Sequence, residues 1–326
     1  MEPGLNERAW KLIAEIERDE TALKIASRTL DCGTKIFDFG VQVVGGLEAG
    51  IKLAELCFAG LGHVSLTNGM LGEASWPAVC VWTDSPVRAC LASQYAGWQI
   101  SVGKYFGMGS GPMRAAAGRE ELFDEIGFVE RADCCVGVIE SSKLPTDEVC
   151  VQIAERCGVA PERLRLAVAP TASLAGNLQV VARSVETALH KLHELGWDVK
   201  HIHCGFGTAP LPPVAADDMT GIGRTNDAIL YGGQVSLWIT GEDDSIEELG
   251  PQIPACASPV YGKPFLQIFE DAGRDFYKID PLLFSPAEVT IHNLDTGKCF
   301  RFGRLAPEVL AESFQISTSD NAEAVT

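Results

Sequence analysis

The sequence predicts an α+β protein built of layered helices and sheets. Three observations support this class. Short apolar runs alternate with segments of helical periodicity, an early hairpin is followed by helical crossovers, and 326 residues with 46% hydrophobic content suffice for two sizeable halves. Hairpins mixed with crossovers are typical of α+β layers rather than of a doubly wound parallel sheet.

The first elements are an amphipathic helix and a hairpin. Trp10, Ile13 and Ile16 share one face of the predicted helix. Residues 22–29 and 35–39 then read as two strands around the turn at 31–34. Further strands are expected at 63–67, 78–83, 98–102, 135–140, 164–168, 199–204 and 234–240, with helices at 45–58, from 85, at 147–157, 177–195 and 264–272.

The predicted helix at 177–195 carries the first candidate for chemistry. Its apolar stripe faces a core, and beside the stripe lies a polar face made of Gln179, Arg183, Glu186 and His190. A cation and a carboxylate one turn apart, downstream of a loop of small polar residues, could act as a base and its partner. On pattern alone, a solvated helix face with an ordinary ion pair is the favoured interpretation, because such pairs are common on helix surfaces.

The domain organisation expected is an N-terminal half over 1–170 and a C-terminal half over 171–316. The segments 30–35 and 294–298 resemble each other, and each precedes an aromatic strand, so the halves could be an intertwined internal duplication. Residues 317–326 are small and polar and are expected to form a disordered tail.

Composition excludes several classes of partner. The formal net charge of −18 argues against nucleic acid or an anionic membrane as the main partner. The eleven cysteines form no Cys-x-x-Cys motif or zinc spacing, which indicates reduced thiols and a cytoplasmic protein. Neither a secretion signal nor an apolar run long enough to cross a bilayer is found.

Several loops and one histidine pair are weaker candidates. The glycine-rich stretch 103–112 is interpreted as a loop that could bring backbone donors near an anion or a flat ring. The stretches 205–210 and 223–227 are interpreted as loops at strand ends, where ligands often bind. His201 and His203 lie on one face of a predicted strand, as in some zinc sites.

Taken together, seven stretches resemble one family, the methenyltetrahydromethanopterin cyclohydrolases of one-carbon metabolism in methanogens and methylotrophic bacteria. These stretches span nearly the whole chain and are GGLEAG (45–50), AGWQ (96–99), FGMGSGP (106–112), APTAS (169–173), GRTND (223–227), YGKPF (261–265) and DFYKIDP (275–281). The resemblance implies hydrolysis of the methenyl bridge of 5,10-methenyl-tetrahydromethanopterin to the 5-formyl derivative, in a homotrimer with a cleft between two halves. It implies neither a metal nor a redox cofactor.

The resemblance also assigns roles to residues. Family members have an Arg and a Glu three apart after the Ala-Pro-Thr-Ala-Ser loop, which here are Arg183 and Glu186. Glu186 is expected to activate water, with Arg183 assisting. The candidates for substrate binding are Lys104, Gly109, Ser110, Arg114, Thr171, Ser173, Asn177, Arg224, Asn226 and Lys263.

Two other functions remain open at this point. The first is a metal-dependent amidohydrolase that uses His201 and His203. The second is a pterin-binding protein without catalysis, which would keep the pocket but would not require Glu186.

Overall fold

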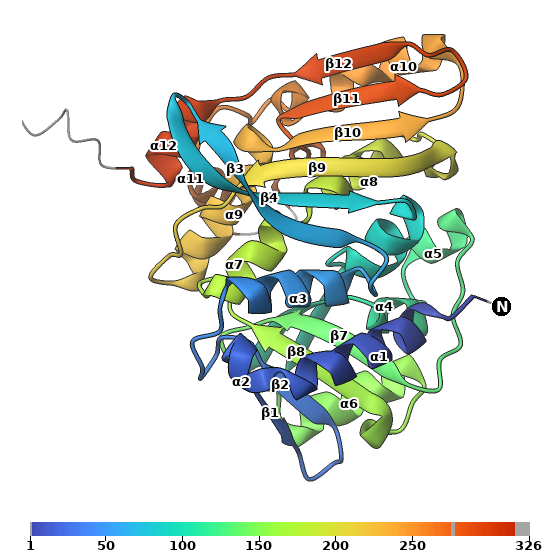
Figure 1. The fold of residues 1–326 in the computed structure, drawn as a ribbon, viewed down its shortest axis with the longest axis vertical. Helices are drawn as coiled ribbons and strands as arrows, with labels where there is room; N and C mark the ends of the chain where they lie inside the picture. The colour runs from blue at the N-terminus through green and yellow to red at the C-terminus, as the bar shows by residue number, and fades with distance from the viewer. Residues whose placement is uncertain (1, 275–277, 317–326) are drawn as a thin grey trace, which may run out of the picture.

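Two mixed six-stranded sheets, stacked one above the other in Figure 1, form the framework of the protein. The computed structural model describes residues 2–274 and 278–316. The lower sheet has the order β1 (Ala26–Thr29), β2 (Lys35–Asp38), β8 (Leu164–Ala169), β7 (Cys135–Glu140), β6 (Tyr105–Ser110) and β5 (Trp98–Val102). The upper sheet has the order β12 (Cys299–Gly303), β11 (Glu288–Asn293), β10 (Gln234–Ile239), β9 (Ile202–Pro210), β4 (Ala74–Thr83) and β3 (His63–Leu71). The predicted α+β class with two halves is confirmed.

Alternation along β7 explains why helices cover both faces of the lower sheet. Val136 and Val138 point toward the core that contains α1 (Leu5–Arg18) and α3 (Leu47–Cys57). Cys135 and Ile139 point the other way, into a second cluster with α6 (Asp147–Cys157). Successive strand residues face opposite sides, so an apolar run such as 135–139 requires cover on both.

The remaining helices connect or cover these layers. They are α2 (Glu20–Leu23), a π-helix at Val87–Gln94, α4 (Met113–Ala117), α5 (Glu121–Ile126), α7 (Leu174–Val181), α8 (Ser184–Glu194), α9 (Asp218–Gly232), α10 (Asp243–Leu249), α11 (Phe265–Asp271) and α12 (Pro307–Ser313). No helix in the described part of the chain is long and apolar enough to span a membrane.

The hairpin β3–β4 joins the upper sheet although it comes early in the chain. From Ala78 to Thr83, β4 pairs antiparallel with β9. Helix α3 lies against α7 where the two halves meet, and a Cβ at Gly50 would come within 2.9 Å of the Leu178 Cβ. The absence of a side chain at Gly50 therefore permits this close helix contact.

Both sheets have a hairpin at one edge. The turn at 31–34 joins β1 to β2, and the turn at 294–298 joins β11 to β12. Each inner hairpin strand then pairs in parallel with the next strand of its sheet, β8 in one and β10 in the other. The strand after the turn is the inner strand β2 in one sheet but the edge strand β12 in the other, so the two resembling segments do not occupy equivalent positions, and the duplication stays a prediction.

Four predicted local structures are wrong. The predicted helix at 177–195 is two helices, because the chain leaves the helical path at Ala182 and Arg183 between α7 and α8. Most of the supposed loop at 103–112 is strand β6, and 205–210 belong to β9. The stretch 223–227 lies inside α9. Glycines in these stretches mimic loop composition, but sheet pairing and close packing override that local preference.

Several boundaries also differ from the predictions, and β3 and β4 in particular are longer than the expected strands at 63–67 and 78–83. The expected strand at 22–29 is shortened by α2, so β1 begins only at Ala26. A short 3-10 turn at Val199–His201 precedes β9, which extends to Pro210. The expected tail at 317–326 lies outside the described residues.

Candidate active site

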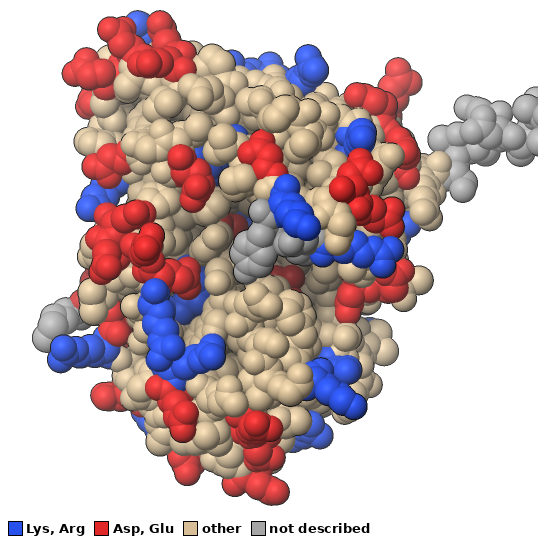
Figure 2. Space-filling view, turned by 180° about the vertical axis from the view of Figure 1, so that it is seen from behind, with Lys and Arg blue, Asp and Glu red and all other residues tan. Residues whose placement is uncertain are grey.

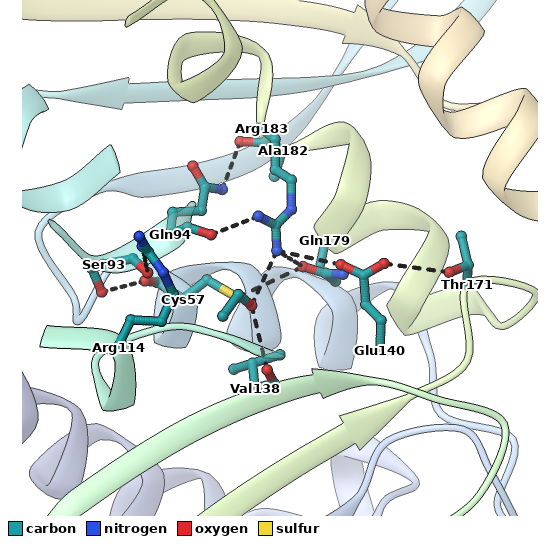
Figure 3. A network of polar contacts seen from close by, with 11 residues as sticks. Cys57, Ser93, Gln94, Arg114, Val138, Glu140, Thr171, Gln179, Ala182 and Arg183 are labelled. Atoms are coloured by element: carbon teal, nitrogen blue, oxygen red, sulfur yellow. Dashed lines mark hydrogen bonds and ion pairs between the residues drawn. The ribbon is translucent and has the colours of Figure 1, made fainter. Parts of the chain in front are cut away.

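Arg183 lies at the centre of a buried polar network where the two halves meet (Figure 3). It occupies the break between α7 and α8, so its side chain is not confined to either helix face. Its Nη1 donates to the carbonyl oxygen of Gln94 at 2.5 Å, and its Nη2 donates to the Ser110 Oγ at 3.1 Å. The same Nη2 lies 3.4 Å from the Glu140 Oε1 and 3.3 Å from the Gln179 Oε1.

The partners of Arg183 come from four separate elements. Gln94 ends the π-helix, Ser110 ends β6, Glu140 ends β7 and Gln179 lies on α7. The hydroxyl of Thr171, in the loop after β8, donates to the Glu140 Oε2 at 3.5 Å. Strand ends and a helix junction thus converge on one guanidinium.

Glu186 lies on the first turn of α8 and is only 4% exposed. Among the described residues, none donates a hydrogen bond to its carboxylate. Burial raises the pKa of Glu186 from 4.5 to about 7, against the opposing effects of Arg183 and Arg114. A carboxylate with a pKa near neutrality is suited to accept a proton from water and later return it.

Arg114 is the second cation near Glu186, and it is fully buried on α4. Its Nε donates to the Glu120 Oε1 at 2.9 Å, and its Nη2 also pairs with Glu120. The guanidinium lies over the ring of Tyr95, 4.7 Å from the centroid, and donates to the carbonyl oxygen of Leu91. The guanidinium of Arg114, a predicted substrate-binding residue, is therefore engaged in contacts within the protein.

Three buried polar atoms around Arg183 have no hydrogen-bond partner among the described residues. They are the Gln94 Oε1, the Gln179 Nε2 and the Nε of Arg183 itself. Buried polar groups in folded proteins are nearly always satisfied, by water or ligand where protein groups are absent. The network is therefore chemically suited to a small polar guest.

The surface of the protein is hollowed in two places. Figure 2 shows the face opposite to that of Figure 1, with a hollow near its middle and both acidic and basic side chains around it. Separately, a cavity of about 660 Å³ is lined by Tyr95, His190 and Trp197, among others. The ring of Tyr95 stacks on that of His190, with 4.8 Å between the ring centroids. His190 lies on α8, one helical turn beyond Glu186.

Some predicted binding residues adjoin the Arg183 network. Gly109 and Ser110 close β6, and Thr171 contacts Glu140. Ser173 begins α7 and accepts a hydrogen bond from the backbone of Gly176, while Asn177 donates to the carbonyl oxygen of Pro212 at 2.7 Å.

Other predicted binding residues have contacts elsewhere. Lys104 is exposed in the turn between β5 and β6. Arg224 donates to the carbonyl oxygens of Ser313 and Pro213, and Asn226 donates to the carbonyl oxygen of Ile222 in its own helix. Lys263 is exposed and pairs with Asp271 at 3.1 Å.

Sequence reasoning missed Glu140, Gln94 and Glu120. Glu140 had a usable signal. A carboxylate that directly follows a buried apolar strand lies at the carboxyl end of that strand, where ligands often bind. Gln94 and Glu120 had none, since their roles depend on contacts with Arg183 and Arg114 that cross the fold.

The two histidines considered for a metal site have too few neighbouring ligands to complete one. His201 and His203 are exposed and both contact the Thr240 hydroxyl, at 3.4 and 3.1 Å. Within residues 2–274 and 278–316, no group of three or more His, Cys, Asp or Glu side chains could hold a metal ion. The structure therefore offers no further ligand to this pair.

Comparison with known proteins identifies the family. The profile of the cyclohydrolase (MCH) family matches residues 4–314. The methenyltetrahydromethanopterin cyclohydrolase of Methylobacillus flagellatus is 45% identical over 97% of this chain and 96% of its own length. Those of Methanococcoides burtonii and Rhodopirellula baltica are 46% and 44% identical, each over 96% of this chain and over 98% and 96% of their own lengths. The resemblance is confirmed, and the chain belongs to the methenyltetrahydromethanopterin cyclohydrolase family.

Proposed function

We propose that this protein hydrolyses 5,10-methenyl-tetrahydromethanopterin to 5-formyl-tetrahydromethanopterin, with Glu186 as the general base. Membership of the family supports the reaction. The observation that supports the role of Glu186 is its buried carboxylate, which has no hydrogen-bond donor among the described residues and has a pKa raised to about 7.

The first step is attack of water on the methenyl carbon. That carbon is part of a cation delocalised between two nitrogens, so it is already electrophilic and needs mainly a positioned water. Glu186 accepts one proton as the oxygen bonds to carbon, and the product of this step is a neutral carbinol bridging both nitrogens. Such general-base assistance contributes about 10²- to 10⁴-fold in rate.

The second step breaks one carbon–nitrogen bond. The carbinol loses its remaining hydroxyl proton to solvent and becomes the formyl carbonyl, while the electron pair of the broken bond goes to the leaving nitrogen. Protonated Glu186 returns its proton to that nitrogen. The sum is one water consumed and one proton released, with Glu186 regenerated as a carboxylate.

Arg183 assists by donating a hydrogen bond to the oxygen atom that attacks the methenyl carbon. Its buried Nε has no partner among the described residues and offers one hydrogen bond to the attacking water or to the developing oxygen charge. Lys104, Arg224 and Lys263 stay candidates for the anionic tail of the carrier. Further candidates for substrate binding are Gly109, Ser110, Thr171, Ser173, Asn177 and Asn226.

The assembly and location are also proposals. We expect a homotrimer, which sedimentation equilibrium tests directly. All eleven cysteines are free thiols in the structure, which supports a reducing compartment such as the cytoplasm.

The decisive experiment follows the absorbance of methenyl-tetrahydromethanopterin with the wild type and with Glu186→Gln, both treated with chelator. We expect rapid decay with the wild type and a loss of at least about 10²-fold in the variant, which should still bind the substrate. Absence of decay in both that is restored by zinc would favour the metal-dependent alternative. Binding without turnover in the wild type would favour the carrier.

A further inference from the structure

Two arginines act on the charge of Glu186, yet each is paired with a different carboxylate. Arg183 pairs with Glu140 at 3.4 Å, and Arg114 pairs with Glu120. Both arginines influence the pKa of Glu186, so both lie within its electrostatic range. Glu186 is thus an unpaired carboxylate near two cations that are already paired with other carboxylates.

The contacts of Glu140 hold it in place as the ion-pair partner of Arg183. It ends β7, where it is paired with Met108 of β6 on one side and Ala169 of β8 on the other. Its second oxygen accepts from the Thr171 hydroxyl at 3.5 Å. The two neighbouring strands fix the backbone of Glu140, and the Thr171 hydroxyl helps to hold its carboxylate beside Arg183.

Arg114 is held in a comparable way on the other side. Carbonyl oxygens of Leu91 and Ser93 accept from its Nη1 at 3.1 and 3.4 Å. The rings of Tyr95 and Phe123 lie 4.7 and 5.4 Å from its guanidinium carbon. With Glu120 completing these contacts, the guanidinium has no freedom to swing onto Glu186.

The charges explain why such pairing matters. A cation that paired directly with Glu186 would stabilise its ionised form and make it a weaker base, and a cationic substrate adds to that effect. A second carboxylate on each cation offsets its field and occupies its donors. Burial then dominates and keeps Glu186 basic.

Building on the proposed function, we infer that Glu140 and Glu120 are positioning residues that hold Arg183 and Arg114 away from Glu186. Through these two pairs, Glu186 stays free of ion pairs and ready to take a proton from water.

Other titratable groups near Glu186 do not supply this effect. The Cys90 thiol and the Tyr95 phenol face it from the π-helix and the residue that follows. Burial raises the pKa of Cys90 well above its usual value and that of Tyr95 to about 12, so both are neutral. Near Arg183, burial raises the pKa of the Cys57 thiol to about 11.

The test titrates Glu186 in the absence of substrate. The carbonyl band of its protonated carboxyl is followed by difference infrared spectroscopy against pH, and is assigned by its loss in Glu186→Gln. In Glu140→Gln and in Glu120→Gln, we expect the midpoint to fall by about one pH unit, since each change leaves a cation unneutralised. The acid limb of kcat/KM should shift in the same direction, and kcat should fall several-fold.

Glu288→Gln is the matched control. Glu288 is buried and pairs with the exposed Arg301 in the upper sheet, so the variant loses a carboxylate–arginine pair that involves neither Arg183 nor Arg114. We expect its Glu186 midpoint to equal that of the wild type. A purely structural role for Glu140 would reduce activity without moving the midpoint.

An unmoved midpoint in either folded variant, as judged by circular dichroism, overturns the inference for that pair. If Glu140→Gln does not fold, Glu120→Gln tests the same idea through Arg114. Because the titration needs no turnover, a shifted midpoint in a protein that hydrolyses nothing would refute only the proposed function. Turnover with an unmoved midpoint would refute only the role of the two pairs.

Discussion

At the scale of single residues, the buried Glu186 lowers the stability of the folded protein when it is ionised, although the proposed reaction needs this ionised form. Its pKa is higher in the folded chain, about 7, than the 4.5 expected when it is exposed. The folded state therefore favours the protonated form, so the contribution of Glu186 to stability is full below about pH 4.5 and is lost as the pH rises through about 7. The ionised form that the reaction needs is the form that destabilises the fold.

Replacing Glu186 with Gln should stabilise the protein at alkaline pH while it abolishes turnover. The shift from 4.5 to about 7 corresponds to at most about 3 kcal/mol above pH 7, and to no gain near pH 4.5. Urea unfolding of both proteins across this interval measures the difference. Glu194→Gln, on the exposed end of α8, is the control and should change stability by less than about 0.5 kcal/mol. A gain for Glu186→Gln that is equal at every pH would contradict this reading.

At the scale of elements, the loop at 170–173 and the start of α7 depend on one glycine. A Cβ at Gly176 would lie 2.0 Å from the carbonyl oxygen of Pro170, a backbone atom that cannot rotate away. The backbone N–H of Gly176 also donates to the Ser173 Oγ that caps the helix. The small residue at this position therefore holds Thr171 within reach of Glu140.

Gly176→Ala should lower both stability and activity. Displacement of the loop should cost about 1–3 kcal/mol, and Thr171 should lose its contact with Glu140. Thermal unfolding and the absorbance assay provide the two readouts. Gly46→Ala is the matched control, because its Cβ would meet only the Leu23 carbonyl oxygen at 3.9 Å. Equal losses in both variants would show that the close contact with Pro170 is not the cause.

Elements differed in how well the sequence could predict them. Helix α6 has the bounds expected, 147–157, because its periodicity, acidic first turn and following Gly158 agree. The break at Ala182 and Arg183 could not be predicted, because the apolar stripe continues across it. What favours the break is the set of acceptors for Arg183 from Gln94, Ser110 and Glu140, which the sequence separates by dozens of residues. Local patterns report local preferences, whereas this site is built from distant contacts.

At the scale of the whole molecule, the two halves do not correspond to two separate stretches of chain. The upper sheet takes β3 and β4 from the first quarter of the sequence and its other strands from residues 202–303. The larger hydrophobic core likewise contains residues of both halves, such as Leu53 and Leu178. The proposed boundary at 170 thus separates sequence segments whose folding is coupled.

Fragments divided at that boundary should not fold alone. Residues 1–170 contain β4 without its partner β9, and residues 171–316 contain β9 without β4. We expect neither fragment to unfold cooperatively on heating. A mixture of the two fragments should recover the protease resistance and the secondary-structure signal of the intact chain. The intact chain is the control. Cooperative unfolding of either fragment by itself would show that it is an independent domain.

The pairing of β4 with β9 has a consequence during synthesis. The ribosome completes β4 at Thr83 and reaches β9 only at Ile202, and at 5–20 residues per second this interval lasts roughly 6 to 24 seconds. Throughout it, the nascent chain carries a long hairpin whose inner edge has no partner and is open to intermolecular pairing. Slow translation between these two points would prolong that exposure, so we expect the yield of active protein to fall when elongation is slowed and to rise with chaperones that cover the unpaired edge of β4.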